Sequence, residues 1–383
     1  MMGRILCVAE KPSIAKTVAQ HLGGVVRTEN IRDNQFIKNY RFDYNFGQRW
    51  GHCHVTFTSV IGHLISHDFS SAYRKWESCN PSVLFDAPIE PSVPDVRLEP
   101  SAATEDIDSV QDKKPIAMNI ETQAQYSDIL YIWTDCDREG ENIGAEIRDI
   151  ALKKNPRLEV KRARFSNVER NHIIQAAHNP AVLDQRQSDA VDARIEIDLR
   201  TGSAITRQLT LNLRGMVPAL VEERKVLSYG SCQFPTLGFV VERYFRVKNF
   251  VPEPFWSIKV IHKKEDTRVT FNWKRVHLFD RMAVVILYER CINAKVAKVV
   301  KMQKRSTSKW RPLPLTTVEL QKMGSRYLRM DSSRVMKVAE DLYTKGWISY
   351  PRTETDQFDH GMDLRSLIQK QTQGTSWGHF AQR

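Results

Sequence analysis

The sequence lacks any hydrophobic run long enough to span a bilayer. Its longest apolar stretch, Met282 to Tyr288, falls far short of the roughly 20 apolar residues that a membrane-spanning helix needs. Near the N-terminus, the apolar stretch Ile5 to Ala9 is ended by Glu10 and Lys11, so it is not the core of a signal peptide. We therefore expect no membrane association, and we expect Ile5 to Ala9 to form a buried strand.

Cysteine is scarce and scattered. The chain has 6 cysteines, at positions 7, 53, 79, 136, 232 and 291, and none stands at the spacing of a zinc knuckle or redox motif. Internal repeats, low-complexity tracts and a Walker-type glycine loop are absent as well. The distribution fits a reduced intracellular compartment with no structural zinc.

Positive charge is what the chain has in excess. Its 383 residues carry 57 Lys and Arg against 45 Asp and Glu, a formal net charge of +12. This balance suits a polyanionic partner such as nucleic acid, although charge alone also fits an ordinary basic protein. The length exceeds what one hydrophobic core supports, so we expect about two to four structural units.

Hydrophobic periodicity predicts two units in which a strand leads into a helix. The first has a strand at Arg4 to Ala9 and a helix capped by Ser13. The second has a strand at Asp128 to Trp133, a turn reaching Gly140 and a helix with one apolar face. Such alternation implies a parallel or mixed sheet covered by helices. Between the two units, Pro91 to Asp112 is predicted to be a surface insertion.

Further along, the pattern changes twice. Asn167 to Arg214 is polar and helical. Aromatic and β-branched residues then predict strands at Phe255 to His262, Thr267 to Trp273 and Val296 to Val300. A basic connector, Lys301 to Arg311, follows them. The chain is therefore predicted to be an α/β unit followed by α and β units.

Helices return after the connector. Ser332 or Ser333 is predicted to cap a helix with Val335, Ala339 and Leu342 on its apolar face.

Four acidic residues follow the ends of the two predicted strands. Glu10 comes after the first strand, and Asp135, Asp137 and Glu139 come after the second. Ligands of open α/β sheets bind at this edge, and carboxylate oxygens suit Mg²⁺. The alternative is an acidic turn that caps the helix beginning near Gly140.

This pairing of acidic segments resembles the Toprim domain, which performs phosphoryl transfer on nucleic acids. The resemblance implies that Asp135, Asp137 and Glu139 handle the metal and that Glu10 is a general acid or base at the scissile phosphate. Lys11 would stabilise charge on the phosphate oxygens. Taken alone, a lysine at this position is more often a solvated surface residue.

Tyr350 stands beside a proline and an arginine. Pro351 pushes Tyr350 out of helical geometry, so the ring can leave the preceding helix. Arg352 falls on the same side of an extended segment, where its guanidinium can pair with a phosphate. The two residues could supply a nucleophile and a clamp. Taken alone, a tyrosine in such a segment is more often a half-buried aromatic residue whose hydroxyl finds a partner.

Six segments occur in the same order as in a known family. They are Val8 to Ser13, Thr58 to Leu64, Trp133 to Glu141, Ile195 to Arg200, Ser228 to Gly238 and Lys345 to Thr355. Together they resemble the eukaryotic topoisomerase III group of the type IA DNA topoisomerases. The resemblance implies a Rossmann-like Toprim domain followed by part of a type IA toroid. Its domains would be 1–165 (Toprim), 166–236 (outgoing part of a winged-helix-like domain), 237–305 (outgoing part of a β-rich arch) and 306–383 (an incomplete tyrosine domain).

The resemblance also implies a mechanism. Tyr350 would attack a backbone phosphate of single-stranded DNA to form a 5′-phosphotyrosine, with Arg352 stabilising the phosphate and no need for ATP. Arg194 would hold phosphates of the cleaved strand, with Asp198 orienting it. Gln233 could contact DNA or stabilise a turn.

Other expectations concern DNA, partners and location. Lys309 and Trp310 in the connector, and the stretch Lys153 to Arg164, are candidates for a basic, aromatic single-strand groove, or merely for solvated faces. His63 is expected to be a structural core residue. The family resemblance implies a RecQ-type helicase and an OB-fold accessory protein as partners, in the nucleus.

The chain stops at Arg383, soon after the tyrosine motif, so the resemblance implies that the return halves of the toroid are missing. Two alternatives therefore stand beside a Mg²⁺-dependent topoisomerase. One is a catalytically impaired DNA- or partner-binding fragment, and the other is a Toprim nuclease in which water replaces Tyr350 as nucleophile.

Overall fold

The computed structural model describes residues 2–94, 113–214, 216, 226–358, 362–374 and 376–383. The chain divides into two compact units. One contains Met1–Ser231 and Pro312–Arg383, and the other contains Cys232–Arg311. Most of the predicted insertion Pro91 to Asp112 lies outside the described residues. The four-domain division stays a prediction.

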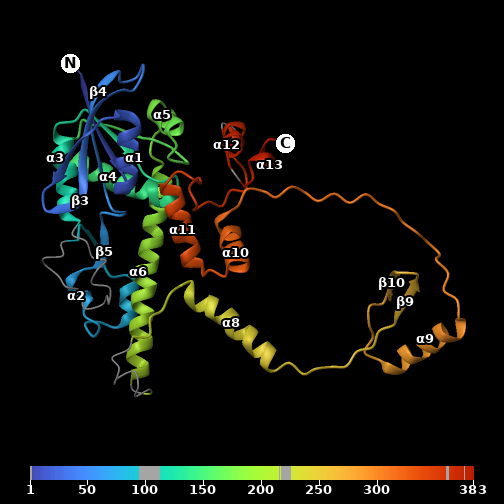
Figure 1. The fold of residues 1–383 in the computed structure, drawn as a ribbon. Coiled ribbons are helices and arrows are strands. Elements are labelled where there is room, and N and C mark those ends of the chain that lie inside the picture. Colours follow the sequence, from blue (N-terminus) through green and yellow to red (C-terminus); the bar gives the residue numbers. More distant parts are fainter. Residues whose placement is uncertain (1, 95–112, 215, 217–225, 359–361, 375) are drawn as a thin grey trace. The chain divides into compact units, whose positions relative to one another are not determined.

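The first unit is built on a mixed six-stranded sheet (Figure 1). Its strands, in spatial order, are β2 (Arg27–Ile31), β3 (Asn34–Asn45), β4 (His52–Ser59), β1 (Gly3–Ala9), β7 (Ile129–Trp133) and β8 (Glu159–Arg162). The pairs β1–β4, β1–β7 and β7–β8 are parallel, whereas β2–β3 and β3–β4 are antiparallel. The predicted α/β fold is therefore confirmed, with β1 and β7 side by side in the interior of the sheet.

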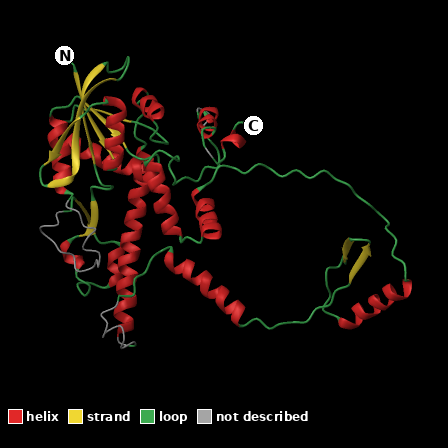
Figure 2. Ribbon diagram, in the orientation of Figure 1, coloured by secondary structure: helices red, strands yellow, loops and turns green. Residues whose placement is uncertain are grey.

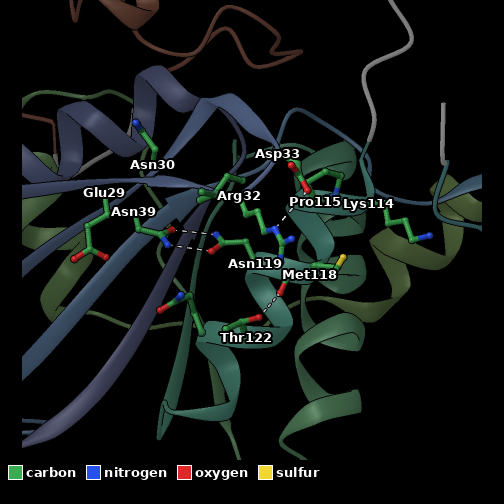
Figure 3. A pocket seen from close by; sticks show the side chains of 12 residues that line it. Glu29, Asn30, Arg32, Asp33, Asn39, Lys114, Pro115, Met118, Asn119 and Thr122 are labelled. Carbon is green, nitrogen blue, oxygen red and sulfur yellow. Dashed lines mark hydrogen bonds and ion pairs between the residues drawn. The ribbon is translucent and has the colours of Figure 1, made fainter. Parts of the chain in front are cut away.

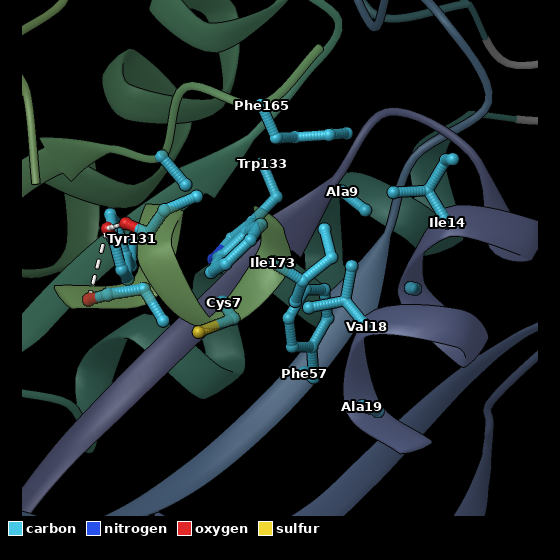
Figure 4. Close-up of a cluster of buried hydrophobic side chains, with 14 of the residues drawn as sticks. Cys7, Ala9, Ile14, Val18, Ala19, Phe57, Tyr131, Trp133, Phe165 and Ile173 are labelled. Carbon is cyan, nitrogen blue, oxygen red and sulfur yellow. Dashed lines mark hydrogen bonds between the residues drawn. The ribbon is translucent and has the colours of Figure 1, made fainter. Parts of the chain in front are cut away.

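Helices cover both faces of this sheet (Figure 2). One face packs against α1 (Pro12–Gly23) and α5 (Arg170–His178), and the other against α3 (Lys114–Gln125) and α4 (Arg138–Lys154). The central strands read as continuous apolar runs because they are buried on both sides. Figure 4 shows the core on the α1 side, where Trp133 and Phe57 pack beside Ile14 and Val18.

A long helix, α6 (Gln185–Arg214), leaves the sheet and runs past a small second layer. That layer consists of β5 (Ser66–Phe69), α2 (Ser71–Arg74), the 3₁₀ helix η1 (Pro81–Phe85) and β6 (Ile89–Ser92). Arg200 and Arg207 of α6 donate hydrogen bonds to its backbone carbonyls, including those of Ala87 and Tyr73. The predicted helical segment Asn167 to Arg214 is thus confirmed.

The end of the chain returns to the first unit as α10 (Thr317–Leu328), α11 (Ser332–Thr344), α12 (Leu364–Gln371) and α13 (Gly378–Ala381). In α11 the buried side chains are Val335, Ala339 and Tyr343, so the predicted face is wrong at its last position, where Leu342 is exposed. Tyr343 joins the same buried cluster as the residues of β1 and α1.

Two predicted helix caps are wrong. The helix α1 begins at Pro12 instead of after Ser13, because the fixed φ of proline suits the first helical position. The helix α11 begins after Asp331, whose carboxylate accepts a hydrogen bond from the Arg334 amide. An aspartate just before the serines satisfies the free amides first.

The second unit has α8 (Gln233–Lys248), a hairpin of β9 (Lys259–Lys264) and β10 (Thr267–Asn272), and α9 (Arg281–Ala294). Two of the three predicted strands are confirmed with changed bounds, since β9 begins and ends later than predicted and β10 ends one residue earlier. The third is wrong, because Val296 to Val300 has no strand beside it to complete its hydrogen bonds in the described part of the chain. Val284 is the one apolar side chain buried within the described residues of this unit.

A cavity of about 520 Å³ lies between the β2–β3 turn and α3 (Figure 3). Inside it, Asn39 and Asn119 exchange hydrogen bonds between their amides. None of the predicted site residues lines this cavity. No helix in the described part of the chain has the length and apolar character needed to cross a membrane.

Candidate active site

The parallel pairing of β1 and β7 brings the acidic residues together. Ala9 lies opposite Trp133 in the register, so Glu10 and Asp135 both follow at the carboxyl edge. The backbone amide of Asp135 donates a hydrogen bond to Glu10 Oε2 at 3.0 Å. Both side chains are buried, with 11% of Glu10 and 1% of Asp135 exposed. Two segments far apart in sequence thus form one acidic edge.

A buried arginine of the neighbouring strand holds the loop that carries Asp135. Arg162 of β8 is fully buried, pairs with Glu141 at 2.9 Å, and donates from Nη2 to the Asp135 carbonyl at 2.6 Å. At the start of α4, Asp137 accepts a hydrogen bond from the Gly140 amide at 2.7 Å. The capping role considered from the sequence is therefore present in the fold. It occupies only Oδ1 of Asp137.

Gly140 makes this turn possible. A Cβ atom built at Gly140 would lie 2.0 Å from the Asp135 carbonyl oxygen, a distance that no folded structure tolerates without a shift. The loop can fold back over the helix start only because this position has no side chain.

Negative charge is concentrated at the edge. Burial, followed by the charge of Asp135, raises the pKa of Glu10 to about 7. Lys11 offsets part of this negative charge, because its Nζ lies 2.8 Å from Asp135 Oδ2 and 3.8 Å from Glu10 Oε1. Glu10 is therefore able to hold a proton near neutral pH, as a general acid must.

Tyr350 lies directly against this edge. Its hydroxyl donates to Asp137 Oδ2 at 2.6 Å, and its amide donates to the Ser166 carbonyl at 2.8 Å. Only 8% of the residue is exposed. Burial and the hydrogen bond to Asp137 raise the pKa of the Tyr350 hydroxyl, so the group is protonated in this arrangement. The alternative considered from the sequence, an aromatic residue whose hydroxyl finds a partner, also fits, because the hydroxyl is hydrogen-bonded to Asp137.

Tyr343 and Glu340 of α11 reach the same edge, although sequence analysis missed both. The Tyr343 hydroxyl donates to Asp135 Oδ1 at 2.9 Å, and its ring packs edge to face on Tyr350 with centroids 5.3 Å apart. Glu340 accepts from Arg352 Nε at 2.8 Å. A signal was available in the helical spacing, because Tyr343 follows Ala339 by four residues on the buried face.

His63 is not a core residue, and that prediction is wrong. Its side chain is 29% exposed, with Nε2 2.9 Å from Glu139 and Nδ1 3.0 Å from Glu146. The hydrogen bond to Glu146 is the main cause that raises the pKa of His63. The amide of the next residue, Leu64, also donates a hydrogen bond to Glu146. His63 is therefore held at the site by two carboxylates, those of Glu139 and Glu146.

Glu139 links the acidic edge to α6. Arg194 Nη2 lies 2.6 Å from Glu139 Oε1, and Arg194 Nη1 lies 3.7 Å from Asp198. Asp198 in turn accepts a hydrogen bond from Ser231 Oγ at 2.9 Å. The structure therefore places Arg194 next to both Asp198 and Glu139 of the acidic loop.

The remaining predicted DNA contacts belong to the second unit. Gln233 is the first residue of α8, and Lys309 and Trp310 are in the connector. The Trp310 ring is 92% exposed.

The acidic edge has the oxygen donors that Mg²⁺ prefers, and its surplus of negative charge is what a cation would relieve. Within the described residues, however, no three His, Cys, Asp or Glu side chains form a ready-made metal cage. The reason is visible in the hydrogen bonds, since Asp135, Asp137 and Glu139 each engage a protein donor. The carboxylates fit the ion chemically. To bind it, they would have to release their hydrogen bonds to Tyr343, Tyr350 and Arg194.

Comparisons with known proteins agree with this architecture. A family model described as DNA topoisomerase matches residues 182–383, and one described as Toprim domain matches residues 5–168. The chain is 46% identical over 380 residues to DNA topoisomerase 3 of Schizosaccharomyces pombe, covering 99% of this chain and 58% of that protein. It is 46% identical over 382 residues to human DNA topoisomerase 3-alpha, covering 99% of this chain and 36% of that protein.

A solved structure has a similar fold. Full-length topoisomerase I from Thermotoga maritima matches with a TM-score of 0.60 and 22% identity, over 95% of this chain and 52% of that one. The chain thus spans little more than half the length of that protein and of the fungal relative. The order of a Toprim domain followed by a topoisomerase domain is the order that the six sequence segments predicted. This chain belongs to the type IA DNA topoisomerase family and is similar to its eukaryotic topoisomerase 3 members.

Proposed function

We propose that this chain cleaves and rejoins single-stranded DNA through a covalent bond between Tyr350 and a 5′-phosphate. The observation that carries the proposal is the 2.6 Å hydrogen bond from the Tyr350 hydroxyl to Asp137 at the acidic edge of the sheet, which supports a role for Tyr350 as nucleophile. Repeated cycles with strand passage would relax negative supercoils and separate interlinked DNA, without ATP.

The residues of the site offer a proton acceptor and a proton donor for the cleavage reaction. The Tyr350 oxygen forms a bond to phosphorus as its proton leaves, with Asp137 as the adjacent acceptor. The bond from phosphorus to the 3′-oxygen breaks, and Glu10 supplies a proton to that oxygen, which suits its pKa of about 7. Rejoining reverses these transfers. The bond energy is kept in the phosphotyrosine, so no cofactor is consumed.

Lys11 and Arg352 would stabilise the charge on the phosphate. Both cations lie at the same carboxylate, Glu340, at 3.4 Å and 2.8 Å. Asp135, Asp137 and Glu139 would hold Mg²⁺, together with Glu10 when Glu10 is deprotonated. Bound there, the ion would offset their repulsion and orient the DNA backbone.

Further DNA contacts are proposed outside the acidic edge. Arg194 would bind phosphates of the cleaved strand, oriented by Asp198, and its exposed fraction of 55% leaves it open to solvent. Gln233, Lys309 and Trp310 would contact the single strand as well. A RecQ-type helicase and an OB-fold protein are proposed as partners, and the nucleus as the location, by analogy with the family.

The test is a trapped covalent adduct. We would incubate the chain with a labelled single-stranded oligonucleotide and Mg²⁺, add denaturant and look for labelled protein. Tyr350→Phe should remove the adduct. The matched control is Tyr327→Phe, which removes a hydroxyl from a tyrosine of α10 that is 70% exposed, and it should leave the adduct unchanged.

The other outcomes identify the alternatives. Cleavage that survives Tyr350→Phe would indicate a nuclease that uses water. DNA binding with neither adduct nor cleavage would indicate a binding fragment. Either result would overturn the proposal.

A further inference from the structure

Glu340 forms a bridge that the reaction scheme does not use. Its Oε1 accepts a hydrogen bond from Arg352 Nε at 2.8 Å, and its Oε2 lies 3.4 Å from Lys11 Nζ. The side chain is 22% exposed, so the bridge is partly shielded from water. One carboxylate thus binds both cations, with one oxygen for each, and Lys11 lies 329 positions from Glu340 in sequence.

The bridged cations are the two that would meet a DNA phosphate. A phosphodiester carries one negative charge shared by two free oxygens, and so does a carboxylate. Glu340 is therefore a chemical stand-in for the group that Lys11 and Arg352 would bind. Lys11 also faces Asp135 at 2.8 Å and Glu10 at 3.8 Å, whereas Arg352 forms an ion pair with Glu340 alone among the described residues.

We propose that Glu340 is a positioning residue that holds Lys11 and Arg352 in place of the scissile phosphate and is displaced when DNA enters. This inference rests on the proposed function of the site. The bridge pre-arranges the two cations, because long side chains would otherwise sample many conformations. It also opposes binding, because the phosphate must replace an ion pair that already exists. The bridge thereby lowers the affinity of the site for DNA while it keeps the side chains of Lys11 and Arg352 ordered.

Because the Glu340 bridge opposes DNA binding, the affinity for DNA should rise when Glu340 loses its charge. Glu340→Gln keeps the size and one oxygen of the side chain, but it no longer pairs with a cation. Removal of a partly exposed ion-pair competitor should tighten DNA binding about fivefold. Salt dependence should steepen too, since each cation freed to meet a phosphate adds about 0.7 to the slope of log K against log salt.

The experiment measures binding without chemistry. A fluorescent single-stranded oligonucleotide is titrated with the 383-residue chain carrying Tyr350→Phe, in EDTA, at several salt concentrations. The same is done after adding Glu340→Gln. The matched control is Asp341→Asn, which removes one negative charge from the next residue of α11, whose side chain is exposed. Circular dichroism checks that each variant is folded.

Tighter binding and a steeper slope for Glu340→Gln, beyond any change in Asp341→Asn, would support the proposal. Equal effects in the two variants would mean that only overall charge changed, and would overturn it. Weaker binding for Glu340→Gln would also overturn it, because Glu340 would then assist DNA instead of competing. Covalent chemistry plays no part in this measurement, so its result is independent of the adduct test.

Discussion

Both compact units contain strands with β-branched or aromatic residues, but the two units bury these strands very differently. In the first unit, all five residues of β7 are buried, between helices on both faces. In the second, every residue of β9 and β10 is exposed, although these strands also carry valine, isoleucine and phenylalanine. The hairpin has hydrogen bonds between its strands and no layer packed over either side within the described residues.

The difference shows that strand-forming residues do not make a core by themselves. Burial of apolar surface is the main stabilising contribution in folding, and a two-stranded hairpin alone is at best marginally stable in water. The central sheet obtains its burial from helices that follow its strands, such as α1 and α4, and from α11, which is distant in sequence. Stability should therefore be concentrated in the first unit, and matched substitutions in the two units can test this.

The largest effect should come from truncating a central isoleucine. Ile132 in β7 is fully buried, so Ile132→Ala should lower the free energy of unfolding by about 3 kcal/mol through lost burial and a cavity. Ile261 in β9 is 44% exposed, and Ile261→Ala should change it by less than about 0.5 kcal/mol. Urea unfolding followed by circular dichroism measures both. Equal losses would mean that β9 is covered in solution.

A second pair compares glycines. Gly140→Ala forces a methyl group toward the Asp135 carbonyl at 2.0 Å, and should cost about 2 kcal/mol as the acidic loop shifts. Gly238 in α8 has nothing within 4 Å of an added Cβ, so Gly238→Ala should stabilise that helix by about 0.5 to 1 kcal/mol. Thermal melts of both variants would show opposite signs. A harmless Gly140→Ala would show that the loop is not tightly held.

The smallest effect concerns pH. The pKa of Glu10 is about 7 in the folded chain against 4.5 as its ordinary value, so the folded state holds the proton more tightly. Stability from this group is therefore full below about pH 4.5 and falls as the pH rises to about 7.

Melting temperatures in metal-free buffer should show this fall, and Glu10→Gln should flatten it. Glu253→Gln, at an exposed position of the second unit, is the control and should leave the profile unchanged. Parallel profiles for the chain and for Glu10→Gln would contradict the shifted pKa.

Sequence patterns predicted what local chemistry determines. Strand β1, strand β7 and the meeting of Glu10 with Asp135 follow from apolar runs and from the rule that parallel strands end at one edge. The buried pairing of Arg162 with Glu141 and the contacts of Tyr343 and Glu340 were not predictable in that way. Each depends on segments that are brought together only by the complete fold, and an arginine or glutamate in sequence gives no sign of its distant partner.

The packing of α11 into the N-terminal core has a consequence for synthesis. Lys11 and Glu340 are 329 residues apart, and a ribosome adds about 5 to 20 residues per second. The apolar surface around β1 and α1 would then wait roughly 15 to 70 s for Tyr343 and Tyr350 to cover it. During that interval the emerging chain presents an unfinished core, so its yield in cells should depend on translation speed and on chaperones that shield such surfaces.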